Sequence, residues 1–325
     1  MGTRRGVLPF SVPVPLALAS PVDQLPAEPG WEFTAKVDGW RALIITGPKP
    51  RIYSRHGTDL TRAFADIAEA ARALPEAALD CELLAVLPDG SLSFGRLQSR
   101  AGKGPRAGEG FTVQAAVFDC LADGPTDLRP ALLPDRRRHM LAVLESGPIP
   151  IQALPATSDP EAAMSWVGGL GGGVEGVVGK RIAAPYRAGR TSGWIKVRET
   201  WTLDAVIIGV TAARNPAQQA LVLAMPTIGG KLRPVAVSLP IAPALRTELA
   251  RLLHPLAGSM VDLPGTVGGL PGSAPTPYLR VEPTTVVEIE SHQGAPEFGR
   301  LRHRPRVLRL RRDLAPADVR TLEHQ

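Results

Sequence analysis

The stretch Ala35-Lys36-Val37-Asp38-Gly39-Trp40-Arg41 is the most informative part of this chain. It ends an alternating apolar run that begins at Trp31, which predicts a strand up to Lys36 and a turn at Asp38-Gly39. A lysine in this position can act as an amine nucleophile toward a nucleotide α-phosphate. A surface lysine beside a common turn is the alternative interpretation.

The bulk composition indicates a globular chain with an acidic partner. The 325 residues suggest two domains or one large domain, and a hydrophobic content of 44% is enough for buried cores. The formal net charge is +6 and the isoelectric point about 9.7, which favours nucleic acid as the partner. The two cysteines, Cys81 and Cys120, lie in apolar runs without a Cys/His cluster, so neither a structural zinc site nor a disulfide framework is indicated.

The N-terminal residues resemble an export signal only superficially. Thr3-Arg4-Arg5 precedes an apolar run, but Pro9, Pro13 and Pro15 interrupt the helix-compatible segment that such a signal prefers. No apolar run approaches the ~20 residues of a membrane span. Together with the basic charge, this favours a cytoplasmic, nucleoid-associated protein that makes no membrane contact.

Residues 31–200 predict strands interleaved with a helix. Short β-type runs at 41–46 and 51–55 flank Gly47-Pro48-Lys49-Pro50, which predicts a hairpin. Apolar residues at helical spacing predict a helix over 64–74, which Pro75 ends. Further strands are expected at 78–87, 111–121 and 174–181.

From Trp201 onward the pattern becomes all-β. Short strands are predicted at 205–210, 220–224, 234–239 and 284–289, with one helix over 245–253. Several short strands with one helix suit a small Greek-key barrel such as an OB-fold. Residues 264–277 are rich in Gly, Pro and Ser, and we expect a mobile loop there.

Two further motifs place charges on short strands. Ser54-Arg55-His56-Gly57 ends one strand, where Arg55 could grip a phosphate or cap a solvated turn. Leu79-Asp80-Cys81-Glu82 places two carboxylates at i and i+2, on one side of an otherwise apolar strand. Because burying two acids together is costly unless cations pair with them, a functional site is the more economical explanation. An edge strand with both acids in water is the alternative.

Three motifs follow later in this region. Val117-Phe118-Asp119 closes an apolar strand, and Phe118 could stack on a base or simply belong to the core. Val174-Glu175-Gly176-Val177-Val178-Gly179-Lys180 frames an apolar run with an acid and a base. Trp194-Ile195-Lys196-Val197-Arg198 alternates, so both cations are expected on one face of a strand.

In this order and spacing the motifs resemble the covalent nucleotidyltransferase superfamily, and most closely the ATP-dependent polynucleotide ligases, over residues 31–312. Tyr186-x-x-Gly189-Arg190-Thr191-Ser192-Gly193-Trp194-Ile195-Lys196 and the arginine-rich residues 299–311 are similar to the DNA ligase branch. Only 35 residues precede Lys36, and the layout resembles the minimal bacterial ligases. The resemblance implies an α+β fold. An ATP-grasp-like nucleotidyltransferase domain with antiparallel sheets would span 1–200, followed by an all-β OB-fold domain over 201–325.

The resemblance also implies that ATP is the substrate. Lys36 would attack its α-phosphate, form a lysine–AMP phosphoramidate and release pyrophosphate. A free lysine amine with a pKa of about 10.4 is almost wholly protonated at pH 7, so nearby cations must favour the neutral form. Glu82 and Glu175 are the expected ligands of Mg²⁺ or Mn²⁺, and Lys180 and Lys196 would neutralise the α-phosphate.

The remaining nucleotide contacts are implied in the same way. Phe118 would stack on adenine, and Thr34 would recognise the edge of the base. Arg41 and Arg55 would grip the ATP ribose-phosphate or the 5′-phosphate of a nick, and Glu82 also belongs to these nucleotide-binding residues. AMP would then pass to the 5′-phosphate, and the 3′-hydroxyl would displace it to seal the strand.

Residues 300–312 contain seven arginines, for which a solvated basic tail is the alternative interpretation. In an extended chain the arginines from 300 to 306 would line one face, and a phase shift after Pro305 would bring Arg309 and Arg311 together. By resemblance, this domain would orient pyrophosphate over the active site and then clasp duplex backbone, with salt-sensitive, sequence-blind binding. The expected DNA or pyrophosphate contacts are Arg198, Arg300, Arg302, Arg304, Arg306, Arg309 and Arg311.

The chain departs from the family pattern in two places. Cys81 stands where glycine is usual between the two acids, and so small a residue should be tolerated. In the arginine-rich motif Arg304 is an extra residue before Pro305, and Leu314 follows Asp313 where a lysine is common. The second departure bears on the help that the OB-fold domain gives to the first step.

The favoured hypothesis is an ATP-dependent DNA ligase that acts as a monomer on nicked duplex DNA, with repair or replication proteins as candidate partners. An RNA ligase or an mRNA-capping guanylyltransferase shares the Lys-x-Asp-Gly core and is the second hypothesis. A catalytically decayed DNA-binding module is the third. The joint presence of Lys36, Glu82, Glu175 and Lys196 argues against decay, which has no reason to spare all four.

Overall fold

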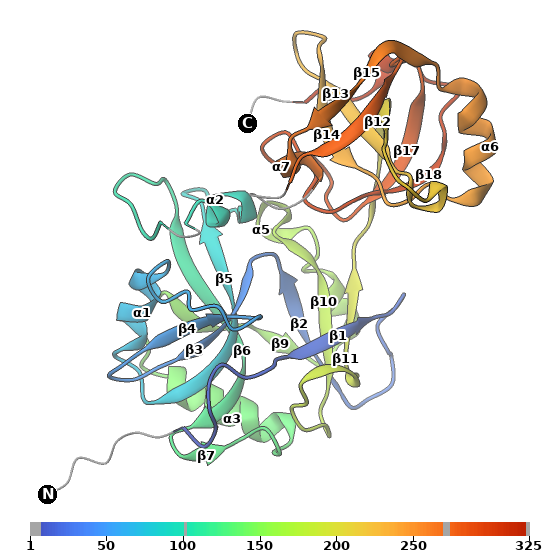
Figure 1. The fold of residues 1–325 in the computed structure, drawn as a ribbon. Helices are drawn as coiled ribbons and strands as arrows, with labels where there is room; N and C mark the ends of the chain where they lie inside the picture. The colour runs from blue at the N-terminus through green and yellow to red at the C-terminus, as the bar shows by residue number, and fades with distance from the viewer. Residues whose placement is uncertain (1–7, 101–102, 269–273, 323–325) are drawn as a thin grey trace, which may run out of the picture. The chain divides into compact units, whose positions relative to one another are not determined.

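The computed structural model describes residues 8–100, 103–268 and 274–322. The chain divides into two compact units, residues 1–199 and 200–325, and each is described by itself (Figure 1). The boundary expected between residues 200 and 201 lies one residue from this division. No helix in the described ranges is long and apolar enough to cross a membrane.

The first unit contains a six-stranded sheet of order β4-β3-β5-β6-β7, with β8 beside β6. All of its strand pairs are antiparallel except β6 with β8. The strands are β3 (Trp40–Ile45), β4 (Arg51–Ser54), β5 (Ala77–Val86), β6 (Thr112–Asp123), β7 (Thr126–Asp127) and β8 (Ile151–Ala153).

The same unit contains a five-stranded sheet of order β1-β11-β10-β2-β9. Its pairs are antiparallel except β1 with β11, which run parallel although about 170 residues separate them. The strands are β1 (Ala17–Pro21), β2 (Trp31–Val37), β9 (Ala156–Thr157), β10 (Val174–Arg181) and β11 (Gly189–Arg198).

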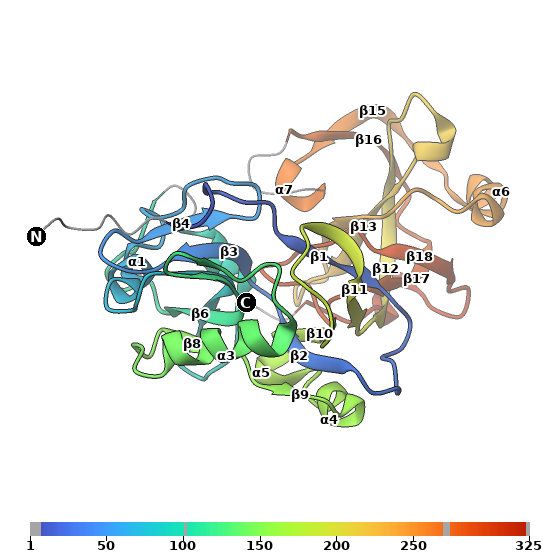
Figure 2. The same cartoon turned by 90° about the horizontal axis from the view of Figure 1, so that it is seen from below.

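Strand alternation gives the six-stranded sheet two apolar faces. One face buries Leu79, Cys81 and Leu83 of β5 in a core that also contains Ile67 and Met140 from two helices. The helices are α1 (Ala65–Ala71), α2 (Phe94–Gln98), α3 (Leu133–Leu144), α4 (Pro160–Met164) and α5 (Gly169–Gly172), drawn in Figures 1 and 2.

The opposite face of the six-stranded sheet packs against the five-stranded sheet. Leu43 of β3 and Leu121 of β6 share one buried cluster with Ala17 of β1 and Trp194 of β11. Asp80 points toward this second core, because residues at even positions of β5 face away from the first. The layer between the two sheets therefore receives both apolar and charged side chains.

Arg136 of α3 is a charged group held inside this unit. Its side chain is 1% exposed, and it donates to both carboxylate oxygens of Asp119, at 2.7 and 3.1 Å. It also donates to the carbonyl oxygens of Ala131 and Ala184, at 2.9 and 3.0 Å. Although burial opposes ionisation, the charges of Lys180 and Arg136 hold the pKa of Asp119 below its ordinary value.

The second unit is built on a seven-stranded antiparallel sheet of order β14-β13-β12-β16-β15, with β17 beside β12 and β18. The long strand β12 pairs with β17 over its first half and with β16 over its last residues. The strands are β12 (Trp201–Thr211), β13 (Leu221–Pro226), β14 (Leu232–Val237), β15 (Pro255–Leu263), β16 (Thr276–Val281), β17 (Val286–Ser291) and β18 (Arg306–Leu310). The helices are α6 (Pro243–Leu252) and α7 (Gly265–Gly268), with 3₁₀ turns at Pro216–Gln218 and Pro316–Asp318.

Several elements predicted from the sequence are confirmed. The hairpin is formed by β3 and β4, and a strand covers 174–181 as expected. The helix expected over 64–74 spans only Ala65–Ala71. The loop expected over 264–277 is shorter, because α7 and the start of β16 lie within it, and residues 269–273 fall outside the described ranges.

We expect Arg136→Ala to lower the free energy of unfolding by about 3–5 kcal/mol, because it leaves the Asp119 carboxylate buried without its main partner. Arg138, on the same helix, is 71% exposed and, among the described residues, forms an ion pair only with Asp135. Arg138→Ala is the matched control and should change stability by less than about 0.5 kcal/mol. Urea denaturation followed by tryptophan fluorescence measures both, and equal effects would contradict the assigned role of Arg136.

Candidate active site

Lys36 and Glu175 form an ion pair between neighbouring strands of the five-stranded sheet. The Nζ of Lys36, on β2, donates to Oε1 of Glu175, on β10. The two side chains are 19% and 8% exposed. Arg198 of β11 brings Nη2 within 3.7 Å of the same carboxylate oxygen. One carboxylate is therefore shared by two cations.

A local irregularity in β10 puts Glu175 beside Lys36. The register of β10 against β2 shifts between Val174 and Val177. Gly176 lies within this shift with φ 157°, and a Cβ there would come 2.1 Å from the Val197 carbonyl oxygen. Only glycine fits so close an approach, and the bulge changes the direction of the preceding side chain.

Gly39 makes the turn that follows the lysine. A Cβ at this position would lie 2.2 Å from the carbonyl oxygen of Leu83 on β5, so the backbone passes directly over that strand. The Asp38 N–H donates to the Gly173 carbonyl oxygen at 2.8 Å. Through this turn β3 begins beside β5, with Arg41 opposite Glu82.

Cations outnumber acids around Lys36. Lys196 and Arg198 lie on one face of β11, while Ile195 packs into a core on the other face. Burial, and then the charges of Arg198, Lys36 and Arg190, lower the pKa of Lys196 to about 8. Such a cluster of cations suits a polyanionic ligand.

Arg41 is held by a buried carboxylate. It donates to both oxygens of Asp80, from Nε at 3.0 Å and from Nη2 at 2.7 Å. The Tyr186 hydroxyl donates to Asp80 Oδ2 at 2.6 Å and accepts from the Ala17 N–H at 2.9 Å. Burial and then the charge of Asp80 raise the pKa of Tyr186, so its hydroxyl remains a donor.

The aromatic rings of Phe118 and Trp194 lie beside Arg41. Phe118 is half-buried and meets Trp194 edge to face, with ring centroids 6.2 Å apart. The Arg41 guanidinium carbon lies 5.3 Å from the Phe118 centroid and 5.6 Å from that of Trp194. Arg41 therefore orders both its acid and its aromatic neighbours.

Lys180 is buried behind Phe118. Its side chain is 1% exposed, and Nζ donates to the Phe118 carbonyl oxygen and lies 3.4 Å from Asp119 Oδ2. Burial lowers the pKa of this lysine, while Asp119 opposes the shift. In this arrangement the ammonium group holds the backbone of the strand that carries Phe118.

The structure brings most of the site residues expected in the first unit into two groups. Lys36, Glu175, Lys196 and Arg198 form one group. Arg41, Phe118 and Lys180 form the other, around Asp80 and Asp119. Thr34 is buried on β2, opposite Val178, which in turn lies opposite Lys196. Glu82 is half-buried beside Arg41.

Arg55 belongs to neither group. Its side chain is exposed and lies 3.1 Å from Nε2 of His56, next to it in the chain. The turn that carries it is closed by local bonds, including the Ser54 N–H to the Thr58 carbonyl oxygen at 2.8 Å. The gripping role expected for Arg55 therefore stays a prediction.

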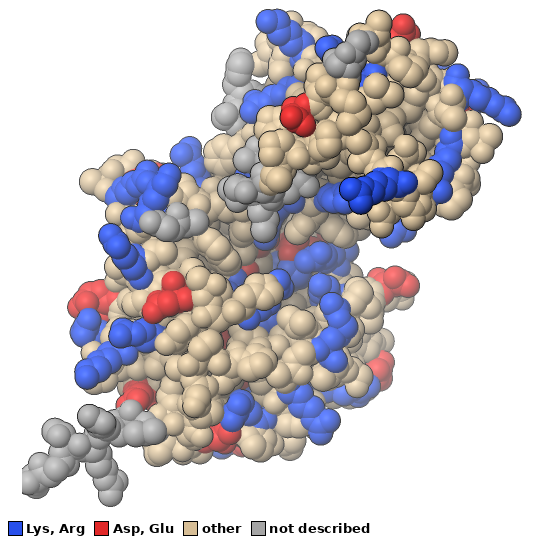
Figure 3. Space-filling view, viewed as in Figure 1, with Lys and Arg blue, Asp and Glu red and all other residues tan. Residues whose placement is uncertain are grey.

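The expected alternation of arginines in the second unit is wrong. Residues 301–305 form no strand, with a bend at 302–303, and Arg304 donates to the Ser238 carbonyl oxygen from Nε at 2.8 Å. The register of β18 shifts around Leu308, which lies after Pro305 as the phase shift in the sequence does. Arg306 and Arg309 consequently lie opposite Glu290 and Glu288 on β17. Figure 3 shows basic side chains spread over the visible face of this unit.

Comparison with known proteins gives the family. The sequence family described as ATP dependent DNA ligase domain matches residues 18–198, which cover β1 to β11 and both groups of site residues. The chain belongs to the ATP-dependent DNA ligase domain family.

The curated relatives of this DNA ligase domain include bacterial proteins. A probable DNA ligase of Mycolicibacterium paratuberculosis is 33% identical over 326 residues, which cover 90% of this chain and 57% of the relative. The multifunctional non-homologous end joining protein LigD of Pseudomonas aeruginosa is 30% identical over 65% of this chain and 26% of its own length. The chain thus spans about half the length, or less, of these curated relatives.

Solved structures show the same architecture. The mycobacterial DNA ligase D complexed with ATP and MES is 26% identical, with a TM-score of 0.51, and the match covers 95% of this chain and 98% of that one. A minimal-scaffold Lig E DNA ligase has a TM-score of 0.56 at 17% identity, covering 92% and 100% of the two chains. This second match shows the fold alone.

Sequence reasoning missed several residues that organise this DNA ligase domain. Asp80 was considered only as one of two strand acids, although it binds both Arg41 and Tyr186. Arg136 was not singled out, because an arginine in a helix with two neighbouring arginines is typical of a solvated face. Its burial follows from the position of α3 against β6. In the sequence, the motif that begins at Tyr186 is the one feature that points to a role for this tyrosine.

We expect Tyr186→Phe to lower the free energy of unfolding by about 1–3 kcal/mol, because the Ala17 N–H loses its acceptor and Asp80 loses a donor inside the protein. Tyr53→Phe is the matched control, because the Tyr53 hydroxyl forms no hydrogen bond with any described residue. It should change stability by less than about 0.5 kcal/mol. Urea denaturation of both variants checks this, and an unchanged Tyr186→Phe midpoint would contradict it.

Proposed function

We propose that this chain is an ATP-dependent DNA ligase that seals 5′-phosphate/3′-hydroxyl nicks in duplex DNA through a lysine–AMP intermediate on Lys36. The observation that carries the proposal is the Lys36–Glu175 pair, set among Lys196, Arg198 and Arg190 in a domain of the DNA ligase family. A nucleophile, a base and surplus cations are what adenylyl transfer to a lysine requires.

In the first step the Lys36 amine attacks the α-phosphate of ATP. A nitrogen–phosphorus bond forms, the bond from the α-phosphorus to the bridging oxygen breaks, and pyrophosphate leaves. Glu175 accepts the hydrogen bond of Lys36 and is therefore the base placed to take its proton. Lys196 and Arg198 supply positive charge to the phosphates, and no proton transfer is needed for that role.

The adenosine contacts follow from the second group of residues. Phe118 would stack on adenine, and its ring is held by Trp194 and by Lys180 behind its carbonyl oxygen. Thr34 would recognise the edge of the base. Glu82 would bind the nucleotide, and Arg41 and Arg55 would meet the ribose-phosphate or the 5′-phosphate of the nick. The 3′-hydroxyl would then displace AMP and join the strands.

A divalent cation fits this donor set only together with the substrate. Among the described residues no three His, Cys, Asp or Glu side chains gather in a way that could hold a metal. Mg²⁺ commonly takes one or two carboxylates and completes its shell with phosphate oxygens and water. Glu82 and Glu175 would be those carboxylates, and Mg²⁺ or Mn²⁺ would supply further neutralisation of the phosphates.

We assign residues 1–200 to an adenylation domain and residues 201–325 to an OB-fold domain. The assignment of the second is supported by its short antiparallel strands, by helix α6, and by the sharing of β12 between β17 and β16. Arg306 and Arg309 have side chains that are 67% and 61% exposed and are the best placed for backbone phosphates. Arg300, Arg302, Arg304 and Arg311 remain proposed contacts to DNA or pyrophosphate.

The proposed setting is a cytoplasmic monomer acting in DNA repair or replication. One relative is a multifunctional non-homologous end joining protein, which supports repair in particular. An RNA ligase or a capping guanylyltransferase would differ in the nucleotide that becomes attached and in the strand that is joined. A decayed module would bind DNA without any covalent nucleotide.

We expect the protein to become labelled by α-³²P-ATP with Mg²⁺, and Lys36→Ala to remain unlabelled, because the variant lacks the attacking amine. A denaturing gel after incubation with ATP or GTP measures this, once pre-bound AMP has been removed with pyrophosphate. Lys103→Ala is the control and should label like the wild type. Transfer of label from GTP would favour capping, and no label from either nucleotide would favour the decayed module.

The pH profile of self-adenylation should fall above about pH 8. Lys196 carries its charge below a pKa of about 8 and loses it above, so the phosphates lose a counter-charge as the pH rises. We expect kcat/KM for ATP, which reports the free protein, to decline about tenfold per pH unit beyond that point. Lys196→Arg keeps its charge and should move the decline upward, while Lys231→Arg should not. A wild-type profile flat to pH 9.5 would contradict this role.

A further inference from the structure

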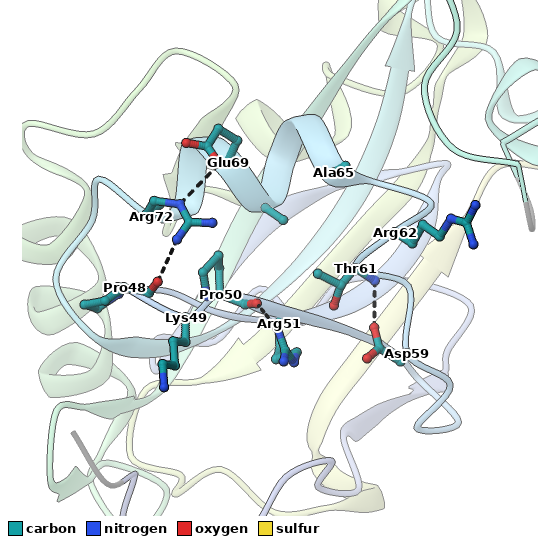
Figure 4. Close-up of a pocket in the computed structure, with 11 residues that line it drawn as sticks. Pro48, Lys49, Pro50, Arg51, Asp59, Thr61, Arg62, Ala65, Glu69 and Arg72 are labelled. Atoms are coloured by element: carbon teal, nitrogen blue, oxygen red, sulfur yellow. Dashed lines mark hydrogen bonds and ion pairs between the residues drawn. The ribbon is translucent and has the colours of Figure 1, made fainter. Parts of the chain in front are cut away.

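A basic groove lies at the hairpin between β3 and β4, in the first unit. The groove has a volume of about 570 Å³, within the range of ligand pockets in proteins. Its walls are the hairpin, the loop that follows β4, and helix α1 (Figure 4). The charged residues that line it are Lys49, Arg51, Asp59, Arg62, Glu69 and Arg72.

The charges of this groove are not balanced internally. Glu69 is paired with Arg72 at 3.2 Å, and Arg72 also donates to the Pro48 carbonyl oxygen at 2.8 Å. Arg51 donates to the carbonyl oxygen of its neighbour Pro50 at 3.1 Å. Lys49 and Arg62 form no ion pair or side-chain hydrogen bond with any described residue, and Figure 4 shows both extending from the lining. Four cations against two carboxylates leave a positive site.

The lining favours phosphate groups over a whole nucleotide. It contains no aromatic ring on which a base could stack, since its apolar part consists of Pro48, Pro50, Ala65 and Ala68. Base stacking is the usual source of affinity for a free nucleotide or an unpaired strand. Cations on exposed loops and helices are the usual contacts of duplex backbone.

The position of the groove suits a duplex that also reaches the candidate active site. Strand β3 runs from Arg41 at that site to the hairpin. At about 3.3 Å per residue this strand spans roughly 17 Å. Along the helix axis of duplex DNA each base pair advances about 3.4 Å, so this span corresponds to roughly five base pairs.

We propose that this groove binds backbone phosphates of duplex DNA several base pairs away from the nick. The proposal rests on the DNA substrate proposed above and adds a second contact, separate from Lys36. Lys49 and Arg62 provide the contacts, while Arg51 and Arg72 shape the walls. Such a contact gives affinity without reading sequence.

The test compares Lys49→Gln/Arg62→Gln with Arg138→Gln/Arg251→Gln, which removes the same charge from exposed helix positions. Fluorescence anisotropy measures the affinity of each protein for a long nicked duplex, with about 20 base pairs on each side of the nick, and for a short one, with about 4 base pairs on each side closed by hairpin loops. Both are measured at several salt concentrations. We expect the groove variant to lose about tenfold in affinity for the long duplex. The slope of log affinity against log salt should fall by about 1.8, since each phosphate contact contributes about 0.9.

A self-adenylation assay distinguishes failure of the groove proposal from failure of the proposed ligase function. The groove variant should accept label from ATP like the wild type, and its affinity for the short duplex should be unchanged. Equal affinities and salt slopes for the groove variant and the wild type on the long duplex would overturn the groove. An equal loss in the charge-matched control would also overturn it, as would a weakening of ATP binding. A wild type that binds DNA but never becomes labelled would instead refute ligation.

Discussion

Charged side chains lie between the two sheets of the first unit, and the arrangement of the site depends on giving each of them a partner. Asp80 and Asp119 are both buried, and each is bound by a guanidinium group through two hydrogen bonds. A lone carboxylate in this layer would be costly, because removal from water disfavours the charged form. The arginine side chains that pair with these acids therefore have little conformational freedom. They determine where the rings of Phe118 and Trp194 and the ends of the strands lie.

The need to pair these buried acids links the stability of the first unit to the geometry of its candidate site. Arg41, held by Asp80, lies over Phe118 and Trp194, and Lys180 holds the backbone of Phe118 from behind. The same charges that satisfy buried acids thus orient the ring proposed to bind adenine. Groups positioned in this way need not rearrange when substrate binds, which is the basis of preorganised electrostatic stabilisation.

Around Lys36 the positive and negative charges are not balanced in this way. Glu175 is one carboxylate among Lys36, Lys196, Arg198 and Arg190, so this part of the site keeps a surplus of positive charge. Burial, and then this surplus of positive charge, lower the pKa of Lys196 in the absence of phosphate. A polyphosphate substrate would relieve the repulsion, so binding energy and local charge are linked. The groove at the β3–β4 hairpin also has more cations than carboxylates, and two of these cations, Lys49 and Arg62, form no ion pair with any described residue.

The sequence by itself determined the local elements and the chemical class. The apolar run over 174–181, the alternation over 194–198, the Pro/Gly hairpin and the helical spacing near Ile67 are short-range patterns, and the structure contains a strand, hairpin or helix at each of them. Only the tertiary structure decided which groups meet. Ala17 and Tyr186 are joined across 169 residues, and the bulges at Gly176 and Leu308 turn Glu175 and the arginines of β18 toward partners on other strands. Such contacts depend on strand register and on the desolvation of distant charges, and a local pattern in the sequence carries no information about either.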